Sequence, residues 1–243
     1  MSRRLPKAPL LEVIFEIRWH INNDDERNRY QYLHGDLYNT LKSEYPFREL
    51  VVPSHFPVEV YLNQVAHRFR QAKGGYPLIQ IGPGIFTINT IEKDYIWEDF
   101  CGQIQNSVKN LITLDSFNAQ LPVSLALRYI DFFQFDFNQN DIKDYLNDFL
   151  HIKVEQEFFK NNAPPYNINL GFTYGTTVGT LNLSVNKGLV DEVEGLIIQI
   201  EVIQQGMNAV ITEIDKWLDS AHILTSDTFN NLTKGKLQDY FNS

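Results

Sequence analysis

Two glycines flank a proline inside the apolar run "QIGPGIFTINT" at 80–90, and this spacing invites comparison with phosphate-binding loops. A Walker loop requires GxxxxGK followed by Ser or Thr, because its lysine and backbone amides surround the phosphates. The next lysine after Gly82 is Lys93, which is too distant to serve. A dinucleotide loop opens a helix, whereas this motif opens a second alternating apolar run. With Pro83 presetting φ and Gly84 accepting positive φ, the motif predicts a type II turn between two strands.

Histidine and cysteine offer no familiar catalytic or metal motif. None of the histidines forms HxH, HxxxH or HExxH; they are His20, His34, His55, His67, His151 and His222. A zinc site assembled from scattered residues stays open. No GxSxG nucleophile elbow occurs, and Cys101 lies beside Phe100 on an apolar helical stripe, which is typical of a buried core thiol. We therefore expect no metal, no cofactor and no assigned catalytic residue.

Arg128 in "LALRYI" and Glu12 in "LLEVIF" are charged residues inside otherwise apolar runs. Because burying a lone charge is costly, each needs a partner or a route to solvent. One interpretation is an ion pair of Arg128 with Glu12 or Glu16, formed if their strands lie side by side. The other is a pocket in which Arg128 binds an anionic ligand, since its planar fork suits carboxylate or phosphate. Arg128, Glu12 and His222 are the candidate ligand-binding residues. The acidic strand around Glu201 lacks the lysine of a restriction-type nuclease site, so a nuclease is not favoured.

The first half of the chain has the periodicities of strands and amphipathic helices. Alternation of apolar and charged residues predicts a strand at 10–19, and spacings of three and four predict a helix at 25–43. Further strands are predicted at 57–62, 65–71, 76–81 and 85–91, and Asp94 is the expected cap of a second helix whose stripe ends at Leu111.

The second half repeats this order. A strand is predicted at 123–135, a helix at 141–150, further strands at 168–174, 178–185 and 195–203, and a C-terminal helix at 207–240, single or divided near 225–227.

The repeated order predicts a pseudo-duplication of two β-α-β(3-4)-α units, 8–115 and 122–243, within one domain or as two closely associated repeats. Short hairpin connections predict antiparallel sheets with helices on one face, an α+β fold with a long C-terminal helix.

Composition limits the classes of partner. The 243 residues carry a formal net charge of −9, so general nucleic-acid binding is not expected. No run of the ~20 apolar residues needed to cross a bilayer occurs, and no signal peptide is recognisable, so we expect a cytoplasmic protein that does not bind membranes. A protein partner or a homo-oligomer is expected.

Four motifs occur in order: "PLLEVIFEIRW", "IGPGIFTINT…YIWEDF", "LRYID" and "LDSAHILTSDTF". Together they resemble a sporadically distributed family of bacterial proteins of similar length that has no assigned activity. The matching positions are Pro9, Leu10, Glu12, Gly82, Gly84, Tyr95, Trp97, Phe100, Arg128, Tyr129, His222 and Phe229. The family's patchy distribution implies horizontal transfer and a role in mobile elements or phage defence.

The resemblance and the missing catalytic motifs favour a non-enzymatic interaction or ligand-sensing protein, an accessory component of a bacterial phage-defence or mobile-element system. Two alternatives remain open. One is a small-molecule-binding protein with a pocket between the sheet and the C-terminal helix, and the other is an enzyme with a site around Arg128 and His222.

Overall fold

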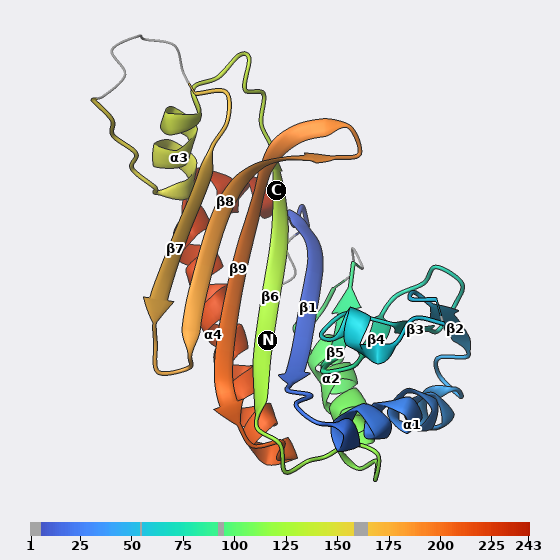
Figure 1. Cartoon of the computed structure of the whole chain (residues 1–243). Helices are drawn as coiled ribbons and strands as arrows, with labels where there is room; N and C mark the ends of the chain where they lie inside the picture. Colours follow the sequence, from blue (N-terminus) through green and yellow to red (C-terminus); the bar gives the residue numbers. More distant parts are fainter. Residues whose placement is uncertain (1–5, 54, 92–94, 158–164) are drawn as a thin grey trace.

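The computed structural model describes residues 6–53, 55–91, 95–157 and 165–243. Its described residues form a mixed α/β fold around one antiparallel sheet of nine strands, in the order β2-β3-β4-β5-β1-β6-β9-β8-β7 (Figure 1). The strands are β1 (Leu10–Trp19), β2 (Phe47–Leu50), β3 (His67–Arg70), β4 (Leu78–Gly82), β5 (Ile85–Thr90), β6 (Val123–Gln134), β7 (Asn169–Gly175), β8 (Thr180–Val190) and β9 (Val193–Met207). The helices are α1 (Asp24–Leu41), α2 (Trp97–Ile112), α3 (Ile142–Leu150), α4 (Ile211–Thr233) and α5 (Lys236–Phe241).

The two strands predicted to begin the halves, β1 and β6, lie side by side at the centre of the sheet. Along β1 every second side chain is buried, at Val13, Phe15, Ile17 and Trp19. This is the period-two pattern that the sequence showed, and it fixes which face of the strand meets the core. The antiparallel register sets Ile14 opposite Arg128, so that Arg128 lies on the opposite face of the sheet from the core residues of β1.

The helices close the hydrophobic core against the central strands. Helix α4 contacts β6 and β9 through a buried stripe at Ile214, Leu218, Ala221 and Thr225, and Figure 1 shows it running behind β8 and β9. Its Trp217 indole donates a hydrogen bond of 2.9 Å to the Val178 carbonyl. The structure thus confirms a C-terminal helix, and this helix packs against β6 and β9.

The Gly-Pro-Gly motif is the turn of the β4–β5 hairpin, as the sequence predicted. Gly84 has φ +88°, a conformation that glycine adopts without a Cβ clash. The turn is buried: the Asn63 amide donates to the Pro83 carbonyl at 2.7 Å, and the Trp19 amide donates to the Gly84 carbonyl at 3.1 Å. The motif therefore closes a hairpin against neighbouring chain segments.

One local prediction is wrong, one strand was missed, and one alternative that the sequence left open is decided by the structure. The segment 57–62 is not a strand but contains the 3-10 helix η1 (Val58–Tyr61), because Val58 and Tyr61, three residues apart, pack on the same side of its single turn. Strand β2 was not predicted. The C-terminal helix does not break at 225–227, where Thr225 is buried and bonded to the preceding turn; it ends at Thr233, and Gly235 with φ +93° precedes α5. The predicted cap Asp94 lies outside the described residues.

Candidate functional site

A cavity of about 400 Å³ opens between α1, β2, β3 and the loops beside them. Its lining combines an apolar wall with cationic and aromatic groups: His34, Arg48, Leu50, Val52, Tyr61, Ala66 and His67. Volumes of roughly 300–1,000 Å³ with a few convergent polar groups are typical of small-molecule sites. This cavity is the candidate site of the protein.

Local sequence patterns bring the polar groups to the cavity. In α1 the apolar stripe of Tyr30, Leu33, Leu37 and Leu41 faces the core, so His34 lies half-buried at the border of that stripe. The N-cap Asn23 accepts a hydrogen bond of 2.9 Å from the Glu26 amide and so fixes where the helix begins.

On the sheet side, the antiparallel register of β2 and β3 brings two cavity residues together. It sets Leu50 opposite His67 and Arg48 opposite Phe69. Successive side chains of a strand alternate between faces, so Arg48 and Leu50 share one face of β2.

Arg48 lies between two imidazoles. Its Nη2 is 2.9 Å from Nδ1 of His34 and 3.4 Å from Nδ1 of His67, and the two rings stack with centroids 4.2 Å apart. A guanidinium only donates hydrogen bonds, so both Nδ1 atoms must accept and each neutral ring carries its proton on Nε2. In the described part of the chain no carboxylate pairs with Arg48. Its charge is held by neutral groups.

Burial and the charge of Arg48 keep the two imidazoles neutral. Burial, followed by the influence of His34 and Arg48, lowers the pKa of His67 to about 3. Burial first and Arg48 second also lower the pKa of His34. Near neutral pH the cavity therefore contains one fixed positive charge and two rings with N–H donors.

The side chain of Tyr30 packs beside two residues that line the cavity, His34 and Tyr61. Tyr30 is buried, and its hydroxyl has no hydrogen-bond partner within the described residues. Its ring is 5.7 Å from that of His34 and 6.5 Å from that of Tyr61, both of which line the cavity. Burial raises the pKa of Tyr30 well above its ordinary value, so the group stays a neutral donor. A buried unsatisfied hydroxyl is costly, and a ligand or water that reached it would remove that cost.

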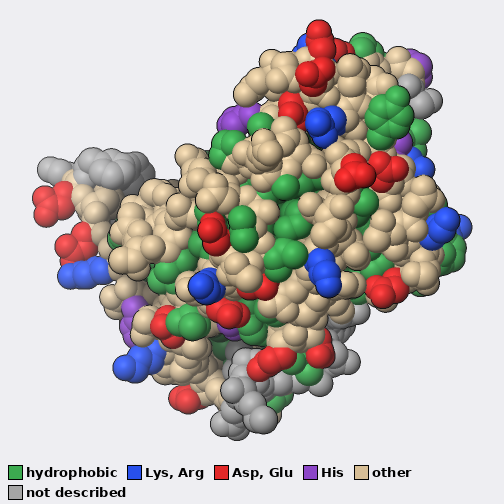
Figure 2. Space-filling model, turned by 90° about the horizontal axis from the view of Figure 1, so that it is seen from below, with side chains coloured by type: hydrophobic (Ala, Val, Ile, Leu, Met, Phe, Trp, Pro, Cys, Tyr) green, Lys and Arg blue, Asp and Glu red, His purple; other side chains and the backbone are tan. Residues whose placement is uncertain are grey.

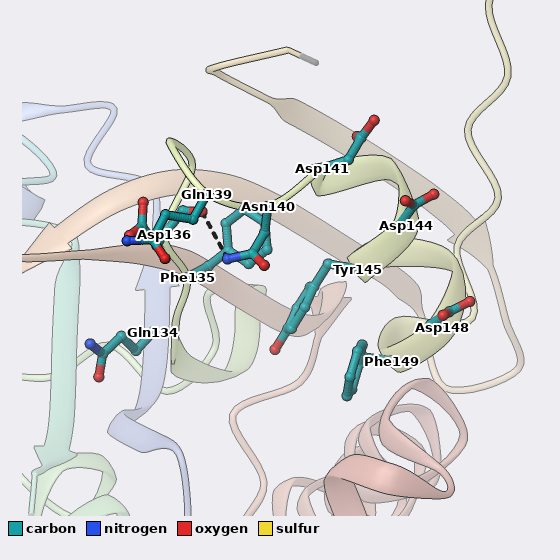
Figure 3. A pocket seen from close by; sticks show the side chains of 10 residues that line it. All are labelled: Gln134, Phe135, Asp136, Gln139, Asn140, Asp141, Asp144, Tyr145, Asp148 and Phe149. Atoms are coloured by element: carbon teal, nitrogen blue, oxygen red, sulfur yellow. Dashed lines mark hydrogen bonds between the residues drawn. The ribbon is translucent and has the colours of Figure 1, made fainter. Parts of the chain in front are cut away.

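A second cavity, of about 490 Å³, lies at the far end of β6 beside α3. It is acidic and aromatic, but Figure 3 shows its carboxylates diverging: Asp144 and Asp148 point outward from α3, whereas Tyr145 and Phe149 point the other way. Asp141 caps α3 by accepting from the Lys143 amide at 2.8 Å. Because these groups do not converge on one point, this cavity is a weaker candidate.

Arg128 does not pair with Glu12 or Glu16, contrary to the sequence-based hypothesis. Its Nε donates a hydrogen bond of 2.8 Å to Glu201 on β9, and its Nη2 donates to the same oxygen. The prediction failed because β6 has two neighbours, and the register sets Glu201 opposite Arg128 on β9 while Ile14 faces it on β1. Glu12 instead accepts from the side-chain amide of Asn89 on β5.

His222 lies in a separate, partly buried cluster of aromatic side chains. Its Nδ1 is 2.8 Å from the hydroxyl of Tyr129, which in turn is 2.9 Å from that of Tyr95, and its ring stacks on Trp97 at 3.9 Å. Tyr129 follows Arg128 in β6, and adjacent strand residues point to opposite faces. The three predicted site residues therefore do not meet, and neither cavity contains any of them.

The cavity residues were missed because nothing in their spacing connects them. His34 and His67 stood among six histidines without a motif, and Arg48 lies in a short strand that was not predicted. The signal available in the sequence was a histidine one turn after Tyr30, at the border of the apolar stripe of the predicted helix.

The described residues show neither a metal-binding cluster nor a membrane-spanning helix. They contain no group of three or more His, Cys, Asp or Glu side chains arranged to hold a metal ion. None of the helices seen in the described ranges has the length and apolar character to cross a bilayer.

Comparison of the chain with protein-family models, with curated proteins and with solved structures found no significant match.

Proposed function

We propose that this protein is a non-enzymatic ligand-sensing protein whose site is the cavity between α1, β2 and β3, and that its ligand is a small organic anion. The observation that carries the proposal is the position of Arg48, held between the Nδ1 atoms of His34 and His67 with no carboxylate partner among the described residues. A guanidinium paired with neutral groups retains its full charge for an incoming anion.

The cavity also accounts for the organic part of the ligand. Leu50, Val52 and Ala66 supply an apolar part of the lining beside the nitrogen donors. Tyr61 lies at the same opening, with its hydroxyl available to orient a bound group. An anion with a short aliphatic or aromatic body matches both surfaces, whereas a bare inorganic ion would leave the apolar wall in contact with water.

Two wider parts of the proposal rest on other observations. Outward from β1 the sheet continues through β5, β4 and β3, and outward from β6 through β9, β8 and β7, which supports two related halves. That the helices of both halves pack on one face is part of the same proposal. The family resemblance supports a bacterial, cytoplasmic accessory role in phage defence or mobile elements.

Extended binding of nucleic acid fits the surface less well. Figure 2 shows acidic and basic side chains interspersed on the face that it presents, with hydrophobic side chains between them. Nucleic-acid interfaces are strongly and continuously basic. The net charge of −9 opposes binding of a polyanion across the whole surface. A small anion needs only one local positive site.

An enzyme built on Arg128 and His222 receives less support. Each is already engaged, Arg128 with Glu201 and His222 with Tyr129. Neither of the two cavities is lined by α4, so a pocket between the sheet and the C-terminal helix is also less favoured than the one at α1.

The test is a titration of the full chain with benzoate, phenyl phosphate, inorganic phosphate and the neutral control benzyl alcohol, followed by calorimetry and by imidazole nitrogen NMR. We expect the organic anions to bind and to shift the signals of His34 and His67. Arg48→Met should abolish binding and Arg48→Lys should weaken it, because lysine keeps the charge but loses the fork.

The matched control is Arg29→Met, which removes an exposed arginine bonded to the Asp115 carbonyl and should bind like the wild type. Equal binding by wild type and Arg48→Met would overturn the proposal, as would no binding of any organic anion.

A further inference from the structure

Strand β7 ends the sheet with an outer edge that lacks the usual protection. Its sequence, NLGFTYG, contains no charged residue and no proline. Natural proteins commonly place such residues on edge strands, because unpaired backbone groups otherwise attract another strand. No strand of the described residues pairs with the outer side of β7. The opposite edge of the sheet is β2, which has only four residues, one of them Arg48.

The hydrogen bonds to β8 identify which residues of β7 direct their backbone outward. The Lys187 amide donates to the Ile168 carbonyl at 3.1 Å, and the Thr176 amide donates to the Gly179 carbonyl at 2.8 Å. Both pairs belong to the same register as β7 and β8, so the even-numbered residues bond to β8. Consequently the N–H and C=O groups that face away from β8 belong to Asn169, Gly171, Thr173 and Gly175.

The side chains beside this edge leave room for a second strand. A Cβ placed on Gly171 or on Gly175 would have no atom within 4 Å. On the other face of the strand, Leu170 and Phe172 are half-buried and Tyr174 is 51% exposed. An approaching strand would thus meet small residues on one face and extend an apolar row on the other.

We propose that β7 pairs with β7 of a second copy of this chain, antiparallel and centred on Phe172, so that the two sheets become continuous. This register bonds Gly171 to Thr173 of the second copy and Asn169 to its Gly175, which uses every outward backbone group of the strand. Phe172 then faces Phe172 across the twofold axis. Leu170 faces Tyr174 of the second copy, and such aromatic and aliphatic cross-strand pairs are stabilising.

The uncharged edge is a surface on which two copies of this acidic chain can approach each other. The whole protein carries −9, so its net charge opposes association of two copies elsewhere. An edge without any charged side chain avoids placing like charges directly opposite each other, which would destabilise the pairing. The self-complementary register satisfies both strands with no further sequence requirement.

The first test is the mass of the full chain in solution by light scattering. We expect a dimer for the wild type and a monomer for Thr173→Lys, because lysine on an edge strand opposes pairing. Ile223→Lys is the matched control: it adds the same charge at an exposed apolar position of α4 and should remain dimeric. A monomeric wild type, or a dimeric Thr173→Lys, would overturn the proposal.

The second test does not depend on how Thr173→Lys folds. Phe172 opposite Phe172 is a non-hydrogen-bonded pair with Cα atoms about 4.5 Å apart, which suits a disulfide. Phe172→Cys should therefore form a covalent dimer under mild oxidation. Tyr174→Cys should not, since its own copy lies four residues away along the partner strand. Equal cross-linking of the two variants, or capture of a foreign extended peptide by a monomeric wild type, would exclude this pairing.

Discussion

Arg128 and Glu201 face each other on neighbouring strands, and two nitrogen atoms of the arginine donate to one oxygen of the glutamate. The Glu201 side chain is only 8% exposed, whereas that of Arg128 is 28% exposed. The other oxygen of Glu201 accepts from Asn182 on β8 at 3.4 Å, and Asn182 accepts from Thr173 on β7 at 3.0 Å. Polar contacts thus connect β6, β9, β8 and β7 across one face of the sheet. Arg128 is the only cation among these residues, and it is the partner of the buried Glu201 carboxylate.

Replacing Arg128 by Ala should lower the free energy of unfolding by about 2–4 kcal/mol, near the lower end of the range for breaking buried pairs, because Arg128 is partly exposed. The physical reason is that Glu201 would remain a buried carboxylate without its cation. Urea unfolding followed by circular dichroism measures the change. The double variant Arg128→Met, Glu201→Gln should recover part of the loss.

An exposed pair provides the comparison. Lys153 and Glu155 pair at 2.7 Å, and their side chains are 73% and 75% exposed. Because solvent screens such pairs, Lys153→Ala should lower the free energy of unfolding by less than about 1 kcal/mol. If the Arg128 and Lys153 variants lost equal stability, the buried-charge argument would be wrong.

The failed pairing of Arg128 shows what the sequence could not determine. Alternation in β1 and β6 predicted two strands with one buried face each, and the structure places them side by side. Which neighbour supplies the counter-charge depends on the strand order and on the register of β9, and both arise from contacts between residues far apart in the chain. Local periodicity contains no information about either.

The cavity was less predictable for the same reason. Helix α1 was predicted within two residues of its ends, so the position of His34 on it followed from the sequence. Strand β2 has four residues with little burial, and its pairing with β3 depends on β3 being paired with β4. The meeting of His34, Arg48 and His67 is therefore a property of the assembled sheet.

Gly82 and Gly84 should not tolerate larger residues. A Cβ on Gly82 would collide with the backbone carbonyl of Gln64. A Cβ on Gly84 would lie 2.7 Å from Asn63 Oδ1 and 2.8 Å from the Trp19 carbonyl, at a positive φ that a β-branched residue resists. Gly84→Val should destabilise the protein by at least ~1 kcal/mol and Gly82→Ala by a similar or larger amount, as measured by thermal unfolding.

The control for these variants is Gly102→Ala. Gly102 is an exposed glycine inside α2, and a Cβ there has open space. Alanine favours a helix over glycine by roughly 0.5–1 kcal/mol, so this variant should gain stability. A loss of stability in Gly102→Ala together with no change in Gly84→Val would contradict the assignment of the turn.

Asp131 should make the stability of the protein depend on pH. Its side chain is buried, and burial raises its pKa from 3.8 to about 7. Between these two values the folded protein holds a proton that the unfolded chain has released. The contribution of Asp131 to the free energy of unfolding is therefore fully present below about pH 4. It is lost as the pH rises toward 7, where the buried carboxyl group must ionise. Asp131→Asn removes this cost. The free energy of unfolding of the variant should therefore exceed that of the wild type by about 2–4 kcal/mol at pH 8 and equal it near pH 4.

Other groups titrate over the same range in the opposite sense. Burial lowers the pKa of His67 to about 3 and that of His222 to about 4, so both favour folding as the pH rises through this window. They are shared by wild type and variant, and the difference between the two urea midpoints isolates Asp131. Asp148→Asn, at an exposed position of α3, should shift the urea midpoint only slightly, and by the same amount at both pH values. A difference between Asp131→Asn and the wild type that did not grow between pH 4 and pH 8 would show that the carboxyl group titrates normally in the folded protein.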